Sequence, residues 1–333
     1  MTEATARIRE AVAADRERAV AFLAELVRTP TDNPPGDLAP AADRIAGLLE
    51  ELGFDVERHP VPPEQVAAVG MKSCTNLVVR RRFGSAGPVI ALNAHGDVVP
   101  PGEGWSVDPY AAVVRDGWMY GRGVAVSKSD IASYAFALRA LEPLAPALAG
   151  AVELHVTFDE ETGGEIGPKW LLEQGVVRPD FAICAGFSWQ VVDAHNGCLH
   201  LEVVVQGRSA HAALPATGID ALEAASSALA ALYEHRRRLA DRVSQVPGIG
   251  SPQLTVGLIA GGINTNVVPD RVTFRLDRRL IPEERGEEVE AELTALIRTA
   301  VGRVPGATVE IRRVLLAEPL RPLPGSARLS SNL

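Results

Sequence analysis

Apolar residues in the first part of the chain recur at helical spacing and are then interrupted by prolines. Residues 5–28 carry apolar positions three and four apart, which predicts one amphipathic helix at the start of the chain. The prolines within residues 29–36 end this helix, because proline lacks an amide donor and restricts the residue before it. A second helix is expected over residues 38–53, where Gly53 ends it.

Short continuous apolar runs then predict strands. Residues 76–81 and 89–93 are bounded by Gly and Pro, and residues 152–157 form a further run. The run at 89–93 is apolar almost throughout, as expected for a strand that is covered on both faces. A helix over residues 128–143 lies between these strands, so this half of the chain is expected to be an α/β domain.

The second half of the chain shows a different order of elements. Strand, helix, strand, strand, helix and strand follow one another, which is the ferredoxin-like order. We expect an inserted domain at 197–315, with residues 1–196 and 316–333 forming the first domain. The expected elements are, in order, residues 201–205, 217–235, 253–259, 272–276, 284–302 and 309–314.

Composition narrows the possible functions. The net charge of -9 argues against a broad nucleic-acid-binding surface, which needs clustered Lys and Arg. No apolar stretch approaches the roughly 18 residues of a membrane span, and the start of the chain lacks the features of a secretory signal. Cys74, Cys184 and Cys198 are too widely spaced for a disulfide framework, so a reducing cytoplasmic location is expected.

Two clusters of charged residues directly follow predicted strands. His95-Gly-Asp97 follows the strand at 89–93, and Asp159-Glu160-Glu161 comes just after the strand at 152–157. In open α/β sheets, ligands bind beyond the carboxyl ends of the strands. Imidazole and carboxylate are zinc ligands, and a neighbouring carboxylate can take a proton from water. The alternatives are a histidine held by local hydrogen bonds and a solvated acidic loop.

Nine motifs in order across about residues 30–280 resemble the family that contains aminoacylase, acetylornithine deacetylase, succinyl-diaminopimelate desuccinylase and glutamate carboxypeptidase. They are T-P-T-D-N-P-P-G (29–36), N-A-H-G-D-V-V-P (93–100), G-W-S-V-D-P-Y (104–110), D-G-W-M-Y-G-R-G (116–123), D-E-E-T-G-G (159–164), A-H-N-G (194–197), G-R-S-A-H-A-A-L-P (207–215), G-G-I-N-T-N-V-V-P-D (261–270) and D-R-R (277–279).

This resemblance implies a fold and an activity. The fold would be a zinc-exopeptidase-like three-layer α/β catalytic domain with an inserted ferredoxin-like α+β lid and dimerisation domain. The activity would be metal-dependent hydrolysis of amide bonds in small N-acyl amino acids or short peptides. The cofactor would be a divalent metal, zinc first, with cobalt or manganese as alternatives. A homodimer formed through the inserted domain would follow.

The resemblance also assigns roles to single residues. His95 would bind zinc, Asp97 would orient His95, Glu160 would be the general base, and Glu161 would bind the second metal. In the inserted domain, the resemblance makes His211, Asn266 and Arg279 substrate-binding residues. For the last two a structural role is the alternative: Asn266 in a turn and Arg279 in a surface ion pair.

The chain departs from the family pattern at several metal ligands. Val126 stands where the family has an aspartate that bridges two metals, and an isopropyl group has no lone pair. Asp130 is a candidate replacement, but it lies about 6 Å further along a helix. The next ligand should fall in residues 182–188, where Cys184 is the candidate donor, although a cysteine in an apolar strand is more often core.

The last family ligand is a histidine near the C-terminus, and no histidine follows His235 in this chain. Of five expected ligands, His95 and Glu161 remain. Three hypotheses follow. The chain is a metal-dependent amidohydrolase, a catalytically degenerate protein that binds a small molecule or regulates, or an incomplete chain whose full-length form is an enzyme.

Overall fold

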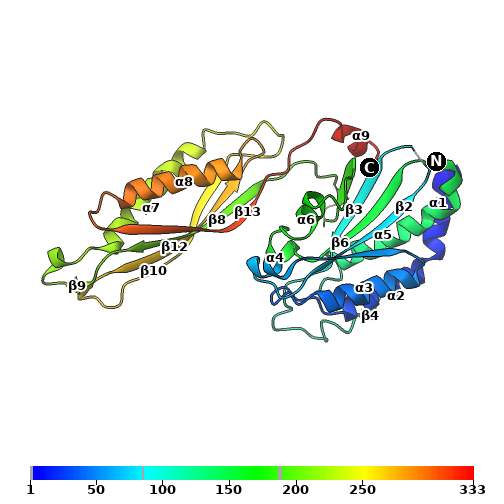
Figure 1. The fold of residues 1–333 in the computed structure, drawn as a ribbon, viewed down its shortest axis with the longest axis horizontal. Helices are drawn as coiled ribbons and strands as arrows, with labels where there is room; N and C mark the ends of the chain where they lie inside the picture. The colour runs from blue at the N-terminus through cyan, green and yellow to red at the C-terminus, as the bar shows by residue number, and fades with distance from the viewer. Residues whose placement is uncertain (1–2, 85, 187–189) are drawn as a thin grey trace. The chain divides into compact units, whose positions relative to one another are not determined.

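The computed structural model describes residues 3–84, 86–186 and 190–333 (Figure 1). The chain forms two compact units, Met1–Trp189 and Gln190–Leu333. The finer expectation, an insertion at 197–315 with residues 316–333 belonging to the first domain, stays a prediction.

A five-stranded mixed sheet forms the centre of the first unit. Its strands are β1 (Val56–Pro60), β2 (Thr75–Arg82), β3 (Val89–His95), β6 (Ala151–Thr157) and β7 (Phe181–Cys184), arranged in the order β1-β2-β6-β3-β7. β6, β3 and β7 run parallel, whereas β1 and β2 pair antiparallel. The three strands predicted in this half of the chain are confirmed, and β1 was not predicted.

Helices cover both faces of this sheet, which gives the predicted three layers. Leu77 and Val79 of β2 are buried toward the larger group of helices, while Val78 points the other way and packs against Leu171. The helices of this unit are α1 (Glu3–Ala14), α2 (Arg16–Arg28), α3 (Ala39–Glu51), α4 (Pro63–Ala68), α5 (Lys128–Leu141) and, on the opposite face, α6 (Pro168–Glu173).

The single helix predicted over residues 5–28 is wrong at Asp15, where α1 ends and α2 begins. The Asp15 carboxylate accepts hydrogen bonds from Arg18 at 2.8 Å and from Arg139 at 3.2 Å. These contacts hold the junction against α5.

Short elements complete the first unit. They are β4 (Val113–Arg115), β5 (Trp118–Tyr120) and the 3₁₀ turns η1 (Glu142–Ala147) and η2 (Glu160–Thr162).

The second unit has the predicted ferredoxin-like order. Its elements are β8 (Gly197–Gln206), α7 (Ala221–Leu239), β10 (Gln253–Gly261), β12 (Arg271–Leu280), α8 (Gly286–Val301) and β13 (Thr308–Ala317). The antiparallel sheet has the strand order β10-β12-β8-β13. Shorter elements are β9 (Ala210–His211), η3 (Pro215–Thr217), β11 (Val267–Val268) and α9 (Ser326–Ser330).

Along most of β8, side chains alternate between the two faces of this second sheet, as the period of a strand requires. Alternate residues of β8, from Leu199 to Val205, are buried in the core shared with α7 and α8. The opposite face carries polar side chains, and we call it the charged face. Its residues are Cys198, His200 and Glu202 of β8 and Arg275, Asp277 and Arg279 of β12.

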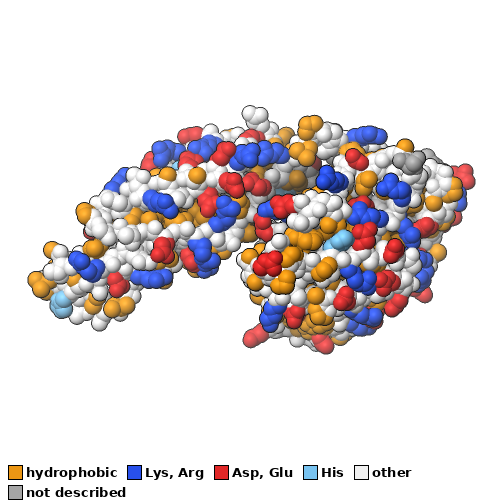
Figure 2. Space-filling model, in the orientation of Figure 1, with side chains coloured by type: hydrophobic (Ala, Val, Ile, Leu, Met, Phe, Trp, Pro, Cys, Tyr) orange, Lys and Arg blue, Asp and Glu red, His pale blue; other side chains and the backbone are white. Residues whose placement is uncertain are grey.

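On the face in view (Figure 2), charged side chains of both signs are mixed rather than gathered in one patch. Figure 2 shows acidic and basic side chains interspersed over the visible face of each unit. Within the described residues, no helix is both long and apolar enough to cross a membrane.

Candidate metal centre

The ends of β3 and β6 bring the two charged clusters together. The strands are parallel neighbours, and His95 lies opposite Thr157. The Gly96 amide donates to the Thr157 carbonyl at 2.7 Å. Gly96 has no room for a side chain, since a Cβ atom there would lie 2.5 Å from the ring of Phe158. The expectation that both clusters meet at one edge of the sheet is therefore confirmed.

Three potential metal ligands converge at this edge. One ligand atom each of His95, Glu160 and Glu161 lies within 4.8 Å of the others. Two ligands of one zinc ion, each about 2.0–2.2 Å from the metal, can be at most about 4 Å apart. Both glutamate side chains are exposed and can rotate, so the three groups lie close enough together for one divalent ion.

Asp97 holds the backbone of both glutamates. Its side chain is fully buried, and Oδ2 accepts hydrogen bonds from the Glu161 amide at 3.1 Å and from Asn33 Nδ2 at 3.0 Å. Oδ1 accepts from the Glu160 amide at 3.3 Å. One carboxylate thus fixes the η2 turn against the loop after β3. We therefore regard Asp97 as the residue that positions the cluster.

The ring of His95 is also oriented by Asp97. His95 Nδ1 donates to the main-chain carbonyl of Asp97 at 2.9 Å, and Oδ1 of the same residue lies 3.4 Å away. Burial lowers the pKa of His95, but the hydrogen bond and charge of Asp97, with the charge of Glu160, outweigh burial and raise it. Because Nδ1 is occupied, Nε2 is the nitrogen available to a metal.

The third acidic residue of the cluster has a structural role instead. Asp159 is fully buried, and its Oδ2 accepts from the amides of Ile166 at 2.6 Å and Gly167 at 2.8 Å. Burial raises its pKa to about 6, although these two hydrogen bonds oppose the shift. Burial, together with the charges of Glu160 and Asp97, also raises the pKa of Glu161.

Residues 29–36 support the centre from the other side. Thr31 Oγ1 donates to the Gly96 carbonyl at 2.6 Å, and the Asn33 amide donates to the Val98 carbonyl at 2.8 Å. Sequence reasoning treated this motif as a helix stop and as part of the resemblance, and it missed Asn33 as a partner of Asp97. An asparagine in a motif shared with a family was the available signal.

Lys128 is a second supporting residue that the sequence did not identify. It is fully buried at the start of α5, and its Nζ donates to the Thr29 carbonyl at 2.8 Å. Burial lowers its pKa to about 8, although the charges of Asp32 and Asp97 favour the ammonium form. Lys128 therefore joins α5 to the loop that carries Asn33.

Within the described residues, the replaced ligand positions supply no further donor to this cluster. Ser127 Oγ donates to Asp130 Oδ2 at 3.0 Å, so Asp130 is engaged at the start of its own helix. Cys184 is exposed on β7, where it pairs in register with Asn93. Neither belongs to the donor group. Phe187 and Ser188 of the expected ligand segment lie outside the described residues.

These observations decide how many ions the donors can hold. Across residues 3–84, 86–186 and 190–333, His95, Glu160 and Glu161 form the only group of three or more candidate ligands. A catalytic zinc ion normally has three protein ligands, so these donors are too few for two ions. The donor set fits one divalent ion, and it does not fit the family's pattern of two.

The predicted substrate-binding residues of the second unit separate into two places. The Ala212 amide donates to the Asn266 carbonyl at 2.9 Å, and His211 pairs with Val267, so His211 and Asn266 are neighbours. Arg279 lies near the far end of β12, eight residues beyond its first residue, Arg271. At about 3.3 Å per residue, Arg271 and Arg279 are about 26 Å apart along the strand, and Asn266 lies a further five residues before Arg271.

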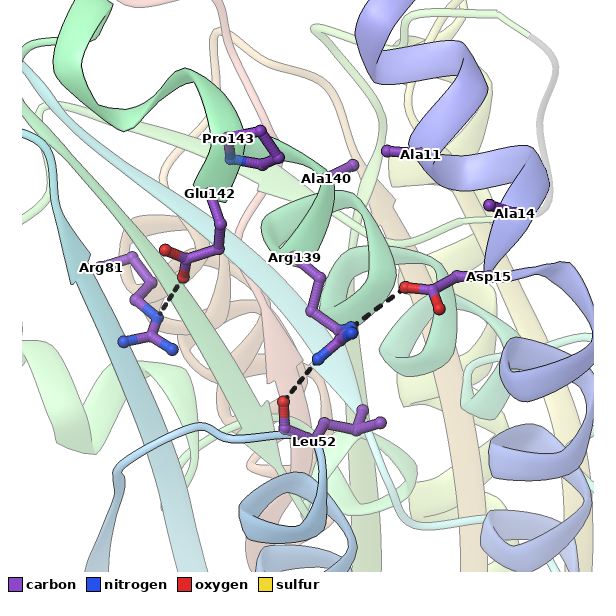
Figure 3. A pocket seen from close by; sticks show the side chains of 9 residues that line it. All are labelled: Ala11, Ala14, Asp15, Leu52, Arg81, Arg139, Ala140, Glu142 and Pro143. Carbon is purple, nitrogen blue, oxygen red and sulfur yellow. Dashed lines mark hydrogen bonds and ion pairs between the residues drawn. The ribbon is translucent and has the colours of Figure 1, made fainter.

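A pocket of about 460 Å³ lies at the other end of the first sheet (Figure 3). Arg139 bridges Asp15 and the Leu52 carbonyl there, and Arg81 pairs with Glu142 at 2.9 Å. Since Arg81 lies opposite the beginning of β6, this pocket is remote from the donors beyond the end of that strand. Its charges are already paired, and we assign it no role in the centre.

Comparison with known proteins identifies relatives of this chain. The chain is 31% identical over 303 residues to a succinyl-diaminopimelate desuccinylase of Gluconobacter oxydans, which covers 88% of this chain and 74% of that protein. It is also 31% identical over 284 residues to an acetylornithine deacetylase of Pectobacterium carotovorum, covering 84% of this chain and 70% of that protein.

The fold is similar to that of a solved M20 family metallo-carboxypeptidase from Sulfolobus solfataricus. The TM-score is 0.72 at 17% identity, over 93% of this chain and 80% of that one. The sequence pattern of peptidase family M20/M25/M40 matches residues 91–315. On the motifs, the fold and this match, the chain belongs to peptidase family M20/M25/M40.

Proposed function

We propose that this protein is a metal-dependent hydrolase of amide bonds in small N-acyl amino acids or short peptides. The observation that carries the proposal is the convergence of His95, Glu160 and Glu161 around the buried carboxylate of Asp97. The names of the relatives, a desuccinylase and a deacetylase, support an N-acyl amino acid as substrate. A protein that only binds a small molecule would not need the general-base candidate Glu160.

His95 and Glu161 are the residues proposed to hold the ion, with zinc as the first candidate and cobalt or manganese as alternatives. When bound, the ion would supply Lewis-acid polarisation of the amide carbonyl. Asp97 keeps His95 in the ring orientation that leaves Nε2 free. The ring of His95 is therefore oriented before substrate binds.

Glu160 is the proposed general base. Its exposed carboxylate is accessible to water, while its amide is fixed by Asp97. In this role, it would take a proton from the attacking water and then deliver that proton to the leaving nitrogen. The tetrahedral intermediate would break down once that nitrogen is protonated and leaves as an amine.

The second unit would bind the substrate, and its geometry supports a homodimer. Arg279 would contact the substrate carboxylate, and His211 and Asn266 would contact the reacting end. A small substrate cannot span about 26 Å along one strand. We therefore propose that His211 and Asn266 come from a second copy of this chain. Light scattering tests this assembly, and a strict monomer at working concentration would exclude it.

A cytoplasmic location accompanies the proposal. Cys74, Cys184 and Cys198 are free thiols in the structure, which supports a reducing compartment.

The activity is tested with three substrates: N-acetylornithine, N-succinyl-diaminopimelate and alanylalanine. The full chain is loaded with zinc, cobalt or manganese, and amine release is measured against Glu160→Gln as the matched inactive variant. Turnover of at least one substrate that Glu160→Gln reduces by about 10²-fold or more supports the proposal. Absence of turnover with every metal and substrate, in protein shown to bind the ion, would overturn it.

A further inference from the structure

Three side chains on the charged face form a hydrogen-bonded row. His200 on β8 lies directly opposite Asp277 on β12, and Arg279 follows two residues later on the same face. His200 Nε2 donates to Asp277 Oδ2 at 2.8 Å, and Arg279 Nε donates to Asp277 Oδ1 at 2.9 Å. Each oxygen of Asp277 thus has a separate donor.

This row leaves the outer edge of the Arg279 guanidinium group free. Asp277 contacts Nε, and among the described residues neither Nη1 nor Nη2 of Arg279 has a partner. The two terminal nitrogens form the planar fork that binds a carboxylate through two parallel hydrogen bonds. The side chain is 54% exposed, so a ligand can reach that fork.

The backbone of Arg279 is held from the opposite face of the sheet. Arg278 is fully buried, its Nη1 donates to the Arg279 carbonyl, and its Nη2 donates to Glu284 Oε1 at 2.6 Å. Arg279 is therefore fixed at its carbonyl by Arg278 and at its guanidinium by Asp277. These two contacts orient the long side chain of Arg279.

A second arginine on the same face provides a contrast. Arg275 contacts Glu202 through both Nε and Nη2, and Arg312 contacts the other oxygen of Glu202 at 2.9 Å. Arg275 has its guanidinium turned onto an acid that two arginines share. That arrangement is typical of a structural ion pair, whereas the arrangement at Arg279 keeps the carboxylate-binding edge exposed.

We propose that His200 and Asp277 are positioning residues that hold Arg279 ready for a substrate carboxylate. Asp277 fixes the guanidinium through Nε, and His200 fixes Asp277 by occupying its other oxygen. The inference rests on the proposed function, in which Arg279 contacts that carboxylate. It adds that the specificity of this protein for a free carboxylate depends on two residues that do not touch the substrate.

The test uses the substrate of the three that is turned over fastest, together with its carboxamide, which lacks the negative charge. The variants are Arg279→Ala, Asp277→Asn and His200→Leu, with Glu202→Gln as the matched control on the same two strands. For the carboxylate substrate, Asp277→Asn should raise KM about tenfold, as expected when one long side chain must be immobilised on binding. Its kcat should change less than about twofold.

The carboxamide separates positioning from general damage. Arg279→Ala and Asp277→Asn should leave the KM of the carboxamide unchanged, and Glu202→Gln should leave the KM of both substrates unchanged. His200→Leu should raise KM for the carboxylate, and His200→Gln should restore it, because the glutamine amide can still donate to Asp277.

The possible outcomes separate the role of Arg279 from the positioning role of Asp277. If Arg279→Ala does not change KM for the carboxylate, the proposed role of Arg279 fails, and this inference fails with it. If Arg279→Ala raises KM but Asp277→Asn does not, the proposed function stands and the positioning role is overturned. An equal rise in KM for the carboxamide would also overturn it, because the loss would then be independent of the carboxylate.

Discussion

Replacing Asp97 by asparagine should weaken both metal binding and the folded state of the first unit. The carboxylate accepts hydrogen bonds from the Asn33 side chain and from the amides of Glu160 and Glu161. An asparagine keeps the size of the side chain but offers one acceptor oxygen, and its NH₂ group faces another donor. One or two buried donors are left without a partner.

The expected magnitude follows from those contacts. Each unsatisfied buried donor costs about 1–3 kcal/mol, so the loss of one or two partners should lower the free energy of unfolding by about 1–6 kcal/mol. Losing a residue that orients metal ligands typically lowers metal affinity about 10–100-fold. That range corresponds to about 1.4–2.8 kcal/mol of binding free energy.

Two assays measure these effects separately. Urea unfolding in the presence of a chelator gives the stability change without metal, and isothermal titration with zinc gives the affinity. Glu153→Gln is the control. Glu153 lies on β6 and is a buried acid like Asp97, but it contacts Arg80 and His155 rather than the metal-binding residues. It should lose stability and keep its metal affinity.

The reasoning would be refuted by an Asp97→Asn protein that binds zinc within about twofold of the original. It would also be refuted if Glu153→Gln lost as much zinc affinity as Asp97→Asn, because the effect would then reflect general destabilisation.

Three further predictions concern the same unit. Val126→Asp should tighten binding of the single zinc ion in isothermal titration, because it adds one carboxylate donor, whereas Val126→Leu should leave the affinity unchanged; an unchanged affinity in Val126→Asp would contradict this. Glu160→Gln should lower kcat about 10²–10⁴-fold with the ion retained; loss of the ion instead would make Glu160 a ligand. Burial raises the pKa of Glu153, but His155 and Arg80 outweigh burial and lower it from its ordinary 4.5. The ionised Glu153 carboxylate therefore stabilises the fold above about pH 4.5, and this stabilisation is lost as the pH falls through the lowered pKa. In urea unfolding from pH 7 to pH 3, the free energy of unfolding of Glu153→Gln should approach that of the original protein as the pH falls.

The position of the site could be predicted from sequence because it depends on local order along the chain. His95 and Glu160 each follow an apolar run, and parallel neighbouring strands end at the same edge of a sheet. The second unit was predictable for a similar reason, since its alternating strands and amphipathic helices are themselves local patterns.

Other features depended on contacts between distant segments. Asn33 reaches Asp97 across 64 positions, and Lys128 reaches Thr29 across 99. The row from His200 through Asp277 to Arg279 exists because β8 and β12 pair in one particular register. A shift of one residue would turn Asp277 toward the helices.

The sequence by itself determined the family, the order of the elements and the identity of the residues able to bind a metal, including the loss of a carboxylate at Val126. Only the tertiary structure decided what Asp159, the remaining acid of the cluster, does. Asp159 turns inward to the amides of Ile166 and Gly167, while Glu160 and Glu161 stay with His95. The physical reason is that a buried carboxylate must find donors, and the folded chain alone fixes where those donors lie.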